Sequence, residues 1–242
     1  MKPEYRLPAK FNRKIGKAMH DYSMLEEGDS VMVAVSGGVD SLVLGWVLKM
    51  WQQKAPINFT LLYLHVDHGF WQDSPGAKDP RKSIGEQLGK YDIKLEVTGE
   101  WQIEGQPRTC FLCARNRRSQ LFDLAREKGI NKIALGHHKD DLIETFMLNA
   151  IYSGNISTMV PKQNLFGDTL SIIRPMAYLE KQEILEIASS LELSPVKNFC
   201  TLSDETRREK VRTFLESLYN EEPGARTSLF AALSNVRKDY LL

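Results

Sequence analysis

The segment Ser36-Gly37-Gly38-Val39-Asp40-Ser41, here called the glycine loop, combines residue types that bind phosphate. Adjacent glycines let the backbone turn tightly and approach an anion without a Cβ clash. The N–H groups at the start of a following helix attract phosphate, and the two serine hydroxyls can donate further hydrogen bonds. Asp40 would repel phosphate unless a divalent cation lies between them, so the loop predicts a nucleotide site with Mg²⁺. The alternative is an ordinary turn in which Asp40 caps a helix.

A second segment holds Cys110 and Cys113 in a C-x-x-C spacing, and Cys200 is the third cysteine of the chain. Three arginines follow the pair directly: Arg115, Arg117 and Arg118. A helix start and these arginines would lower the thiol pKa values below the ordinary value of about 8.5. Three thiolates leave one ligand position open, which suits either a zinc site or a four-iron cluster with one iron free to bind sulfide. Buried structural cysteines are the remaining alternative.

A third segment, Gly136-His137-His138-Lys139-Asp140-Asp141, is called the histidine–aspartate loop below. Gly136 permits a close backbone approach, and the two aspartates suit a helix cap, Mg²⁺ binding or the orientation of a substrate group. We favour a functional role for Asp141 because the glycine loop is present. His65 stands near the end of another apolar run, where it suits either contact with adenosine or a satisfied buried position.

Strand-like and helix-like patterns alternate around these segments. The predicted strands are 31–35, 58–66, 93–97, 132–135 and 170–173, and the stretches 99–109 and 153–168 are predicted loops. The predicted helices are a short one in residues 1–22, then 40–53, 80–91, 113–128, 140–151, 180–191, 205–219 and 225–238. This alternation predicts an α/β fold with a parallel, doubly wound, Rossmann-like sheet, an N-terminal helix and a C-terminal helical extension. The carboxyl ends of the parallel strands would bring the three segments to one edge.

Composition excludes several classes of protein. The chain has 242 residues, of which 42% are hydrophobic and 26% charged, values typical of a globular domain. We find no apolar run long enough to span a bilayer and no secretory signal, so we expect a cytoplasmic protein without a membrane partner. The low, odd cysteine count fits a reducing compartment.

The glycine loop resembles the PP-loop of the N-type ATP pyrophosphatases, which adenylate a carbonyl oxygen so that a nucleophile displaces AMP. In the same order follow the C-x-x-C with its arginines, the histidine–aspartate loop, Ile173-Arg174-Pro175-Met176 and a late cysteine. Together these motifs, over about residues 30–200, resemble the tRNA 2-thiolation enzymes and above all the tRNA 2-thiocytidine synthetase family. The domains then expected are a basic N-terminal helical segment (1–27), a PP-loop ATP-binding catalytic domain (28–200) and a C-terminal helical extension (201–242).

The resemblance implies a role for each matching residue. ATP would be bound by Ala34, Ser36, Gly37, Gly38, Asp40, Ser41, His65, Arg115 and Gly136, with Asp40 also binding Mg²⁺. Cys110, Cys113 and Cys200 would hold a [4Fe-4S] cluster, with zinc as the alternative. Asp141 would act at the adenylation centre, and Arg117 stands where relatives carry a basic residue. The implied reaction adenylates the C2 oxygen of a tRNA pyrimidine, with cytidine favoured, and replaces it with sulfur from an external donor, either a cysteine desulfurase or sulfide.

Three departures from the family pattern bear on this interpretation. Relatives often carry Lys where this chain has Val39, so the charge that neutralises phosphate must come from Lys139 or from the arginines. The late cysteine stands alone rather than in a second C-x-x-C, and the zinc-finger cysteines of related 2-thiouridine enzymes are absent. The alternatives are therefore a lysidine-synthetase-like tRNA ligase and a non-catalytic nucleotide-binding protein with a structural zinc.

The formal net charge of +1 conceals an uneven distribution. Residues 1–20 contain six basic residues and one acidic residue, so we expect a helix with a basic outer face. Local basic patches can bind RNA phosphates without a basic whole, and we expect Lys10, Arg13, Lys14 and Lys17 to contribute to tRNA binding. A homodimer is one option for the assembly, which the sequence leaves open.

Overall fold

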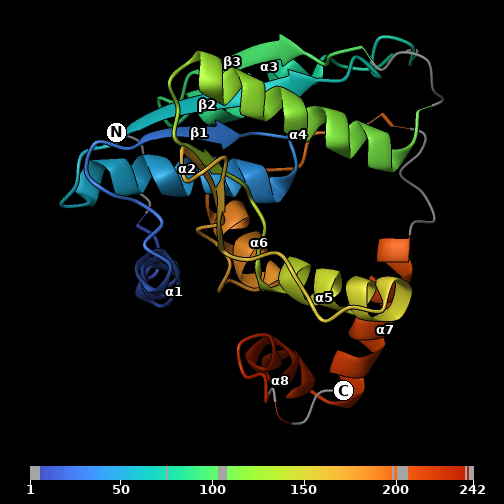
Figure 1. The fold of residues 1–242 in the computed structure, drawn as a ribbon. Coiled ribbons are helices and arrows are strands. Elements are labelled where there is room, and N and C mark those ends of the chain that lie inside the picture. The colour runs from blue at the N-terminus through green and yellow to red at the C-terminus, as the bar shows by residue number, and fades with distance from the viewer. Residues whose placement is uncertain are drawn as a thin grey trace.

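The computed structural model describes residues 6–74, 76–102, 108–197, 199–200, 207–237 and 239. A six-stranded sheet has the order β3-β2-β1-β4-β6-β5 (Figure 1). The strands are β1 (Ser30–Ala34), β2 (Thr60–Asp67), β3 (Leu95–Gly99), β4 (Lys132–Ala134), β5 (Lys162–Leu165) and β6 (Leu170–Ile173). The helices are α1 (Ala9–Asp21), α2 (Val39–Lys54), α3 (Pro80–Gly89), α4 (Cys110–Glu127), α5 (Lys139–Ser153), α6 (Lys181–Ser190), α7 (Arg207–Glu221) and α8 (Ala225–Ala232).

The two faces of the sheet are covered by different helices, as expected for a doubly wound fold. In β1, Val31 and Val33 belong to the larger core with α1, α2, α3 and α6, whereas Met32 points to the opposite face. That opposite face is closed by α4 through Leu121 and Ala125. This alternation follows from the two-residue period of a strand, and it confirms the α/β class predicted from the sequence.

The strand order reverses its direction between β1 and β4. The chain runs outward from β1 through β2 to β3, and then returns to place β4 on the other side of β1. Ligand sites of open α/β sheets form at such a switch point, outside the carboxyl ends of the strands. The glycine loop follows β1 and the histidine–aspartate loop follows β4, so both lie at this position.

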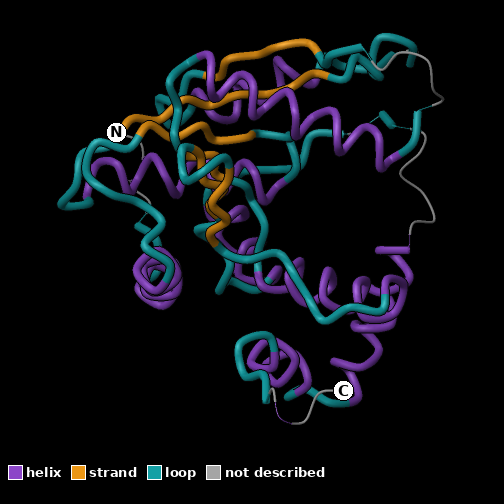
Figure 2. The backbone as a smooth tube through the Cα atoms, viewed as in Figure 1, coloured by secondary structure: helices purple, strands orange, loops and turns teal. Residues whose placement is uncertain are grey.

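One strand was absent from the sequence-based prediction. Residues 162–165 form β5, which pairs antiparallel with β6, so the sheet is not wholly parallel. The hairpin turn spans 166–169, and three of its residues, Phe166, Gly167 and Asp168, have positive φ values. Lys162, Gln163 and Asn164 gave no apolar pattern because β5 is a half-exposed edge strand. The preceding segment, 154–161, runs along α5 (Figure 2), where the Thr158 hydroxyl donates to the Leu142 carbonyl.

Helix positions agree with the predictions except at some ends. The N-terminal helix is confirmed as α1, whose buried residues Phe11, Ile15, Ala18 and Met19 join the main core. Helix α4 begins at Cys110 rather than Cys113, because the Thr109 side chain caps it by accepting from the Leu112 amide. Helix α8 ends at Ala232, short of the predicted 238. The predicted start of α7 at residue 205 and the position 238 lie outside the described residues.

A third apolar cluster joins the C-terminal helices to the histidine–aspartate loop. Ile143 of α5 packs with Val211 and Leu215 of α7, and Phe230 of α8 packs at the margin of the same cluster. Figure 1 shows α7 crossing α5 and α8 lying below it. These helices therefore contribute side chains to the helix that begins at the histidine–aspartate loop.

Candidate functional site

The glycine loop is held in shape by its own hydroxyl groups. The Ser36 amide donates to the Ser41 hydroxyl oxygen at 3.1 Å, and that hydroxyl donates to the Gly38 carbonyl at 2.8 Å. Gly37 has φ = +87°, and a Cβ there would lie 2.9 Å from the Ile84 side chain. The loop therefore requires glycine at position 37 both for its conformation and for its close packing against α3.

Gly136 brings the two loops together. A Cβ at this position would lie 3.0 Å from the Asp40 carbonyl carbon and 3.1 Å from the Ser41 nitrogen. The close approach predicted at this glycine is thus to the first turn of α2, which packs directly on the backbone of the histidine–aspartate loop. The N–H groups of the glycine loop and the aspartates of the second loop consequently face a common space.

The cation beside Asp40 is Lys181, the first residue of α6. Its ammonium nitrogen lies 2.6 Å from Asp40 Oδ1. The Lys139 ammonium instead lies 2.8 Å from Glu180 Oε1 and over the Phe230 ring, so it is occupied away from the glycine loop. Lys181 is therefore the lysine whose ammonium pairs with the carboxylate of the glycine loop.

His138 lies among three carboxylates. Its Nε2 is 3.3 Å from Asp141 Oδ2 and 3.9 Å from Asp40 Oδ1, and its Nδ1 is 3.5 Å from Asp140 Oδ2. Burial alone would lower the pKa of His138, but Asp140, Asp141 and Asp40 outweigh burial and raise it. The imidazole thus favours the charged form and partly neutralises the carboxylates around it.

The adjacent aspartates have different surroundings. Asp140 Oδ2 accepts a hydrogen bond from the Lys181 amide at 2.8 Å, and its Oδ1 lies 3.1 Å from Arg226 Nε. Asp141 Oδ2 accepts from the His138 amide at 3.0 Å, capping α5, and its Oδ1 lies 3.6 Å from Arg208. Asp140 therefore orders the start of α6, whereas Asp141 keeps an oxygen that no described group approaches within hydrogen-bonding distance.

Two arginines of α7 neutralise the buried Glu144, one turn after Asp141. Arg212 contacts both carboxylate oxygens, at 2.9 Å and 3.2 Å. Arg208 lies 3.3 Å from the same carboxylate and donates to the Thr145 hydroxyl at 3.2 Å. Arg212 makes a bidentate contact with Glu144, and Arg208 also lies 3.6 Å from Asp141.

Two residues that were expected to bind ATP, Ala34 and His65, lie at the ends of β1 and β2. Ala34 is the last residue of β1 and pairs with Leu64, and the buried His65 contacts the Val35 carbonyl through Nδ1 at 2.8 Å. Burial lowers the pKa of His65, so its neutral form is favoured. The structure thus brings Ala34 and His65 to the sheet edge that carries the glycine loop.

Cys110 and Cys113 stand in the first turn of α4, and Cys200 is also partly accessible. Burial, the Glu100 carboxylate and the thiols of Cys200 and Cys110 raise the pKa of Cys113, although Arg108 opposes them. The expected lowering is therefore wrong for Cys113. The arginines named for that effect do not act on it because Arg115, Arg117 and Arg118 are exposed further along α4.

The structure brings the three cysteines into one region, but their side chains are not arranged as the ligands of a preformed metal site. The influence of Cys110 and Cys200 on the pKa of Cys113 places the three thiols within electrostatic range. Among the described residues, no three His, Cys, Asp or Glu side chains already surround a common point as metal ligands. Arg115 and Arg117 make no side-chain hydrogen bond or ion pair with a described residue.

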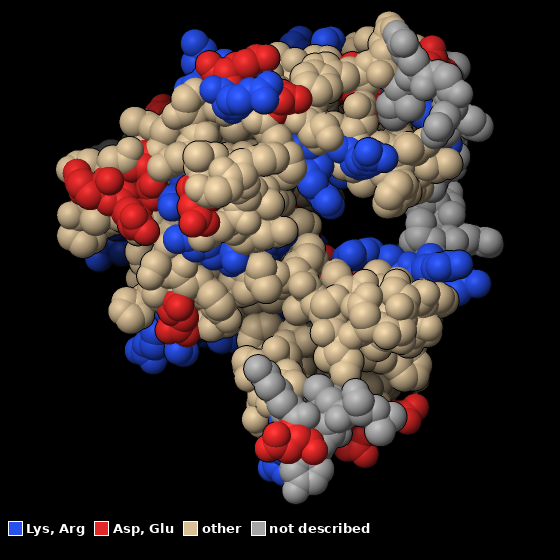
Figure 3. Space-filling model, viewed as in Figure 1, with Lys and Arg blue, Asp and Glu red and all other residues tan. Residues whose placement is uncertain are grey.

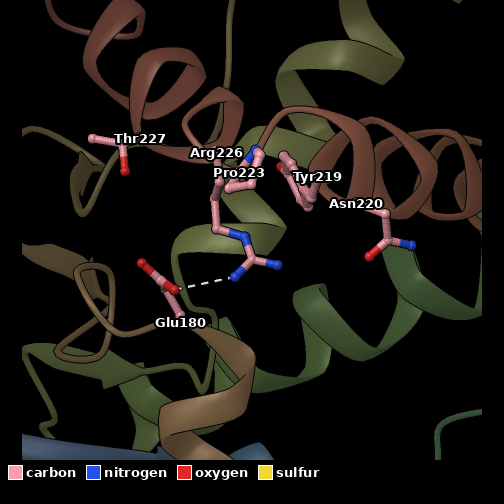
Figure 4. Close-up of a pocket in the computed structure, with 6 residues that line it drawn as sticks. All are labelled: Glu180, Tyr219, Asn220, Pro223, Arg226 and Thr227. Atoms are coloured by element: carbon pink, nitrogen blue, oxygen red, sulfur yellow. Dashed lines mark hydrogen bonds and ion pairs between the residues drawn. The ribbon is translucent and has the colours of Figure 1, made fainter.

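A pocket of about 300 Å³ lies beside Glu180 and Arg226 (Figure 4). It is lined by Glu180, Tyr219, Asn220, Pro223, Arg226 and Thr227. The Arg226 guanidinium lies 3.1 Å from Glu180 and 4.4 Å from the centre of the Tyr219 ring. The cavity thus separates the start of α6 from the turn between α7 and α8, and Arg226 bridges it to Asp140.

Comparison with known proteins places this geometry in a family. The PP-loop domain family matches residues 7–218, which include both loops, all three cysteines and most of α7. The chain belongs to the PP-loop domain family. As a PP-loop protein it has a six-stranded α/β sheet with the expected loop at the end of β1.

Similar curated PP-loop proteins are named tRNA-cytidine(32) 2-sulfurtransferase. The protein of Cupriavidus necator is 35% identical over 98% of this chain and 76% of its own length. That of Alcanivorax borkumensis is also 35% identical, over 98% of this chain and 84% of its own length. The U34-tRNA thiolase NcsA from Methanococcus maripaludis, solved with its [4Fe-4S] cluster, shares the fold with a TM-score of 0.73 at 22% identity, covering 92% of this chain and 77% of that one.

Several residues of this PP-loop site were given no role from the sequence. Lys181, Arg208 and Arg226 contact the site aspartates from helices that follow in the chain, and His138 lies between those aspartates. Lys181 was the most accessible to prediction, because it stands in the first turn of a predicted helix shortly after the Arg174-Pro175 motif. Among the described helices, none combines the length and apolar character needed to cross a membrane.

Proposed function

We propose that this protein catalyses the ATP-dependent 2-thiolation of a cytidine in tRNA. The observation that carries the proposal is 35% identity to tRNA-cytidine(32) 2-sulfurtransferases over nearly the whole chain, together with a site that has the required parts. Those parts are a phosphate-binding loop, an aspartate at its margin and three cysteines in one region. A lysidine-synthetase-like ligase would need the loop but not the cysteines.

In this proposal the glycine loop binds the ATP phosphates through backbone N–H groups and the hydroxyls of Ser36 and Ser41. Asp40 would hold Mg²⁺, an ion that commonly uses one or two carboxylates together with substrate phosphates and water. A preformed protein cage is therefore not required. Ala34, His65, Arg115 and Gly136 would place the nucleoside.

The cytidine would be turned out of its stack so that its C2 oxygen reaches the α-phosphate. Adenylation makes that oxygen part of a good leaving group, and pyrophosphate departs. Asp141 would orient the base, and Lys181, His138 and Arg117 would stabilise negative charge at the phosphates. Replacement of the adenylated oxygen by sulfur then releases AMP.

The cysteines fit an iron–sulfur cluster by the chemistry of their donors. Soft thiolates select iron–sulfur clusters and zinc, and the three cysteines are the only ones in the chain. When bound through three thiolates, a four-iron cluster supplies one iron with an open position suited to sulfur. The sulfur would come from an external donor, sulfide or a cysteine desulfurase.

The test combines metal content with product analysis. Protein purified without oxygen should contain iron and acid-labile sulfide near four per chain, and with ATP, Mg²⁺, sulfide and unmodified tRNA it should form 2-thiocytidine detectable by nucleoside mass spectrometry. The Cys200→Ala variant should lose iron while it still binds ATP. Stoichiometric zinc without iron, together with no tRNA-dependent ATP–pyrophosphate exchange, would overturn the proposal. A lysine-dependent product would favour the ligase.

A further inference from the structure

Helix α4 presents a group of exposed arginines. Arg115, Arg117 and Arg118 are exposed, and none of them makes an ion pair with a described residue. Arg118 lies close enough to Arg174 to help lower the pKa of that buried guanidinium to about 10, an effect due chiefly to burial. This electrostatic influence connects the exposed side of α4 to Arg174, which donates to His137 at the histidine–aspartate loop.

Helix α7 presents a second set of basic side chains. Arg207 and Lys210 are exposed and make no ion pair with a described residue, and the Arg207 guanidinium lies 4.9 Å from the ring centre of the exposed Tyr152. Figure 3 shows a hollow between the surface over α4 and the surface over α5 and α7, with basic side chains on both sides. The two helices thus form opposite rims of one depression.

Three lysines of α1 differ, because acidic neighbours pair with them. Lys14 lies 2.8 Å from Glu183 and Lys10 lies 3.3 Å from Glu186, both in α6. Lys17 lies 2.7 Å from Asp21 in its own helix. A phosphate that approached α1 would have to displace these carboxylates, so the structure favours another surface over the one expected from the sequence.

We propose that the sugar–phosphate backbone of the RNA substrate binds across the hollow, between the arginines of α4 and the basic residues of α7. This inference rests on the proposed function and specifies its substrate surface. Unpaired guanidinium groups contact phosphate without the cost of breaking an existing ion pair. Exposed aromatic side chains, Phe111 on the α4 rim and Tyr152 beside α7, can stack on unpaired bases.

Direct tRNA binding at several salt concentrations tests the inference. The full chain is titrated with a fluorescent tRNA transcript, without ATP, and compared with Arg118→Gln/Arg207→Gln/Lys210→Gln. Each basic side chain that pairs with a phosphate adds about 0.7–0.9 to the slope of log K against log salt, so the variant should have a slope smaller by about 2 and an affinity lower by on the order of 10- to 100-fold. The matched control is Lys10→Gln/Lys14→Gln/Lys17→Gln in α1, whose lysines are already paired with carboxylates, and it should stay within about twofold of the unaltered protein.

The outcomes separate this inference from the function beneath it. Unchanged binding by the hollow variant, with weaker binding by the α1 variant, would overturn the inference and leave the proposed function standing. Failure of the unaltered protein to bind any tRNA would overturn the proposed function as well. Equal thermal unfolding midpoints and equal ATP affinity in both variants would show that weakened tRNA binding reflects the surface rather than the fold. The hollow variant could also keep its tRNA affinity but lose the ability to bind an acidic protein. That result would assign the hollow to a protein partner and overturn the inference.

Discussion

The ammonium nitrogen of Lys181 lies 2.6 Å from Oδ1 of Asp40, and the backbone amide of the same lysine donates to Asp140 at 2.8 Å. One residue at the start of α6 thus contacts both loops of the site. If Asp40 holds Mg²⁺ as proposed, the Lys181 ammonium would be free to pair with the phosphates and would replace the charge missing at Val39.

We expect Lys181→Met to weaken ATP binding by roughly 10- to 100-fold, the range for removal of a charge-assisted hydrogen bond. Stability should change little, because the Lys181 side chain is 42% exposed and its ion pair is screened. Calorimetry with a non-hydrolysable ATP analogue and Mg²⁺ measures the effect. Lys128→Met, which removes a comparable ion pair with Glu96, is the control. Undiminished ATP affinity in Lys181→Met would show that the lysine only neutralises Asp40.

The two arginines that contact Glu144 should have separable effects. Arg212→Ala removes the two-pronged partner of a buried carboxylate and should destabilise the protein by about 2 kcal/mol. Arg208→Ala leaves that partner in place, so the loss of stability should stay below about 1 kcal/mol. Because Arg208 also reaches Asp141, its removal should slow ATP–pyrophosphate exchange about tenfold. Denaturant unfolding and exchange rates compare the two, and equal effects on both readouts would contradict the division.

Adjacent aspartates should also respond differently to substitution. Asp140→Asn weakens the cap of α6 and the contact with Arg226, and should lower stability by about 1–2 kcal/mol. Asp141→Asn should reduce tRNA-dependent ATP–pyrophosphate exchange by on the order of 100-fold while ATP still binds. Thermal unfolding and exchange kinetics distinguish them. A fully active Asp141→Asn variant would remove this residue from the reaction.

His137 should make the protein sensitive to acid. Burial, with the positive charges of Arg174 and Arg208, lowers the pKa of His137 to about 4, against an ordinary value near 6.5. Protonation therefore favours the unfolded chain: stability is complete above pH ~6.5 and declines as the pH falls toward 4. At pH ~4.5 this group should cost about 2 kcal/mol.

His137→Asn isolates that contribution, because the amide oxygen can still accept from Arg174 Nε. Urea unfolding at several pH values should show a smaller acid-dependent loss in the variant than in the unaltered protein. Parallel pH profiles for the two proteins would assign the acid sensitivity to the carboxylates instead.

The sequence predicted those features that depend on local pattern. The buried runs of β1 and β4 and the loops after them were recognisable from apolar periodicity and from Gly37 and Gly136. The edge strand β5 escaped prediction because half-exposed polar residues carry no such periodicity.

Contacts between distant segments could not be predicted. Lys181 lies 141 positions from Asp40 in the chain, so no local sequence pattern indicates that the two side chains meet. The raised pKa of Cys113 depends on burial and on Glu100, and both act on the cysteine only in the folded chain. The same holds for the carboxylates of α6 that neutralise α1.

The dependence of α5 on α7 has a consequence for synthesis on the ribosome. Glu144 is buried in the folded protein, yet its arginine partners Arg208 and Arg212 lie 64 and 68 positions later in the chain. A nascent polypeptide that has completed α5 must therefore hold this carboxylate in water, or protonate it, until α7 emerges from the exit tunnel. The start of α5, and with it Asp141, would reach its final position only at that late stage of translation, so incomplete chains would be kept from premature catalysis.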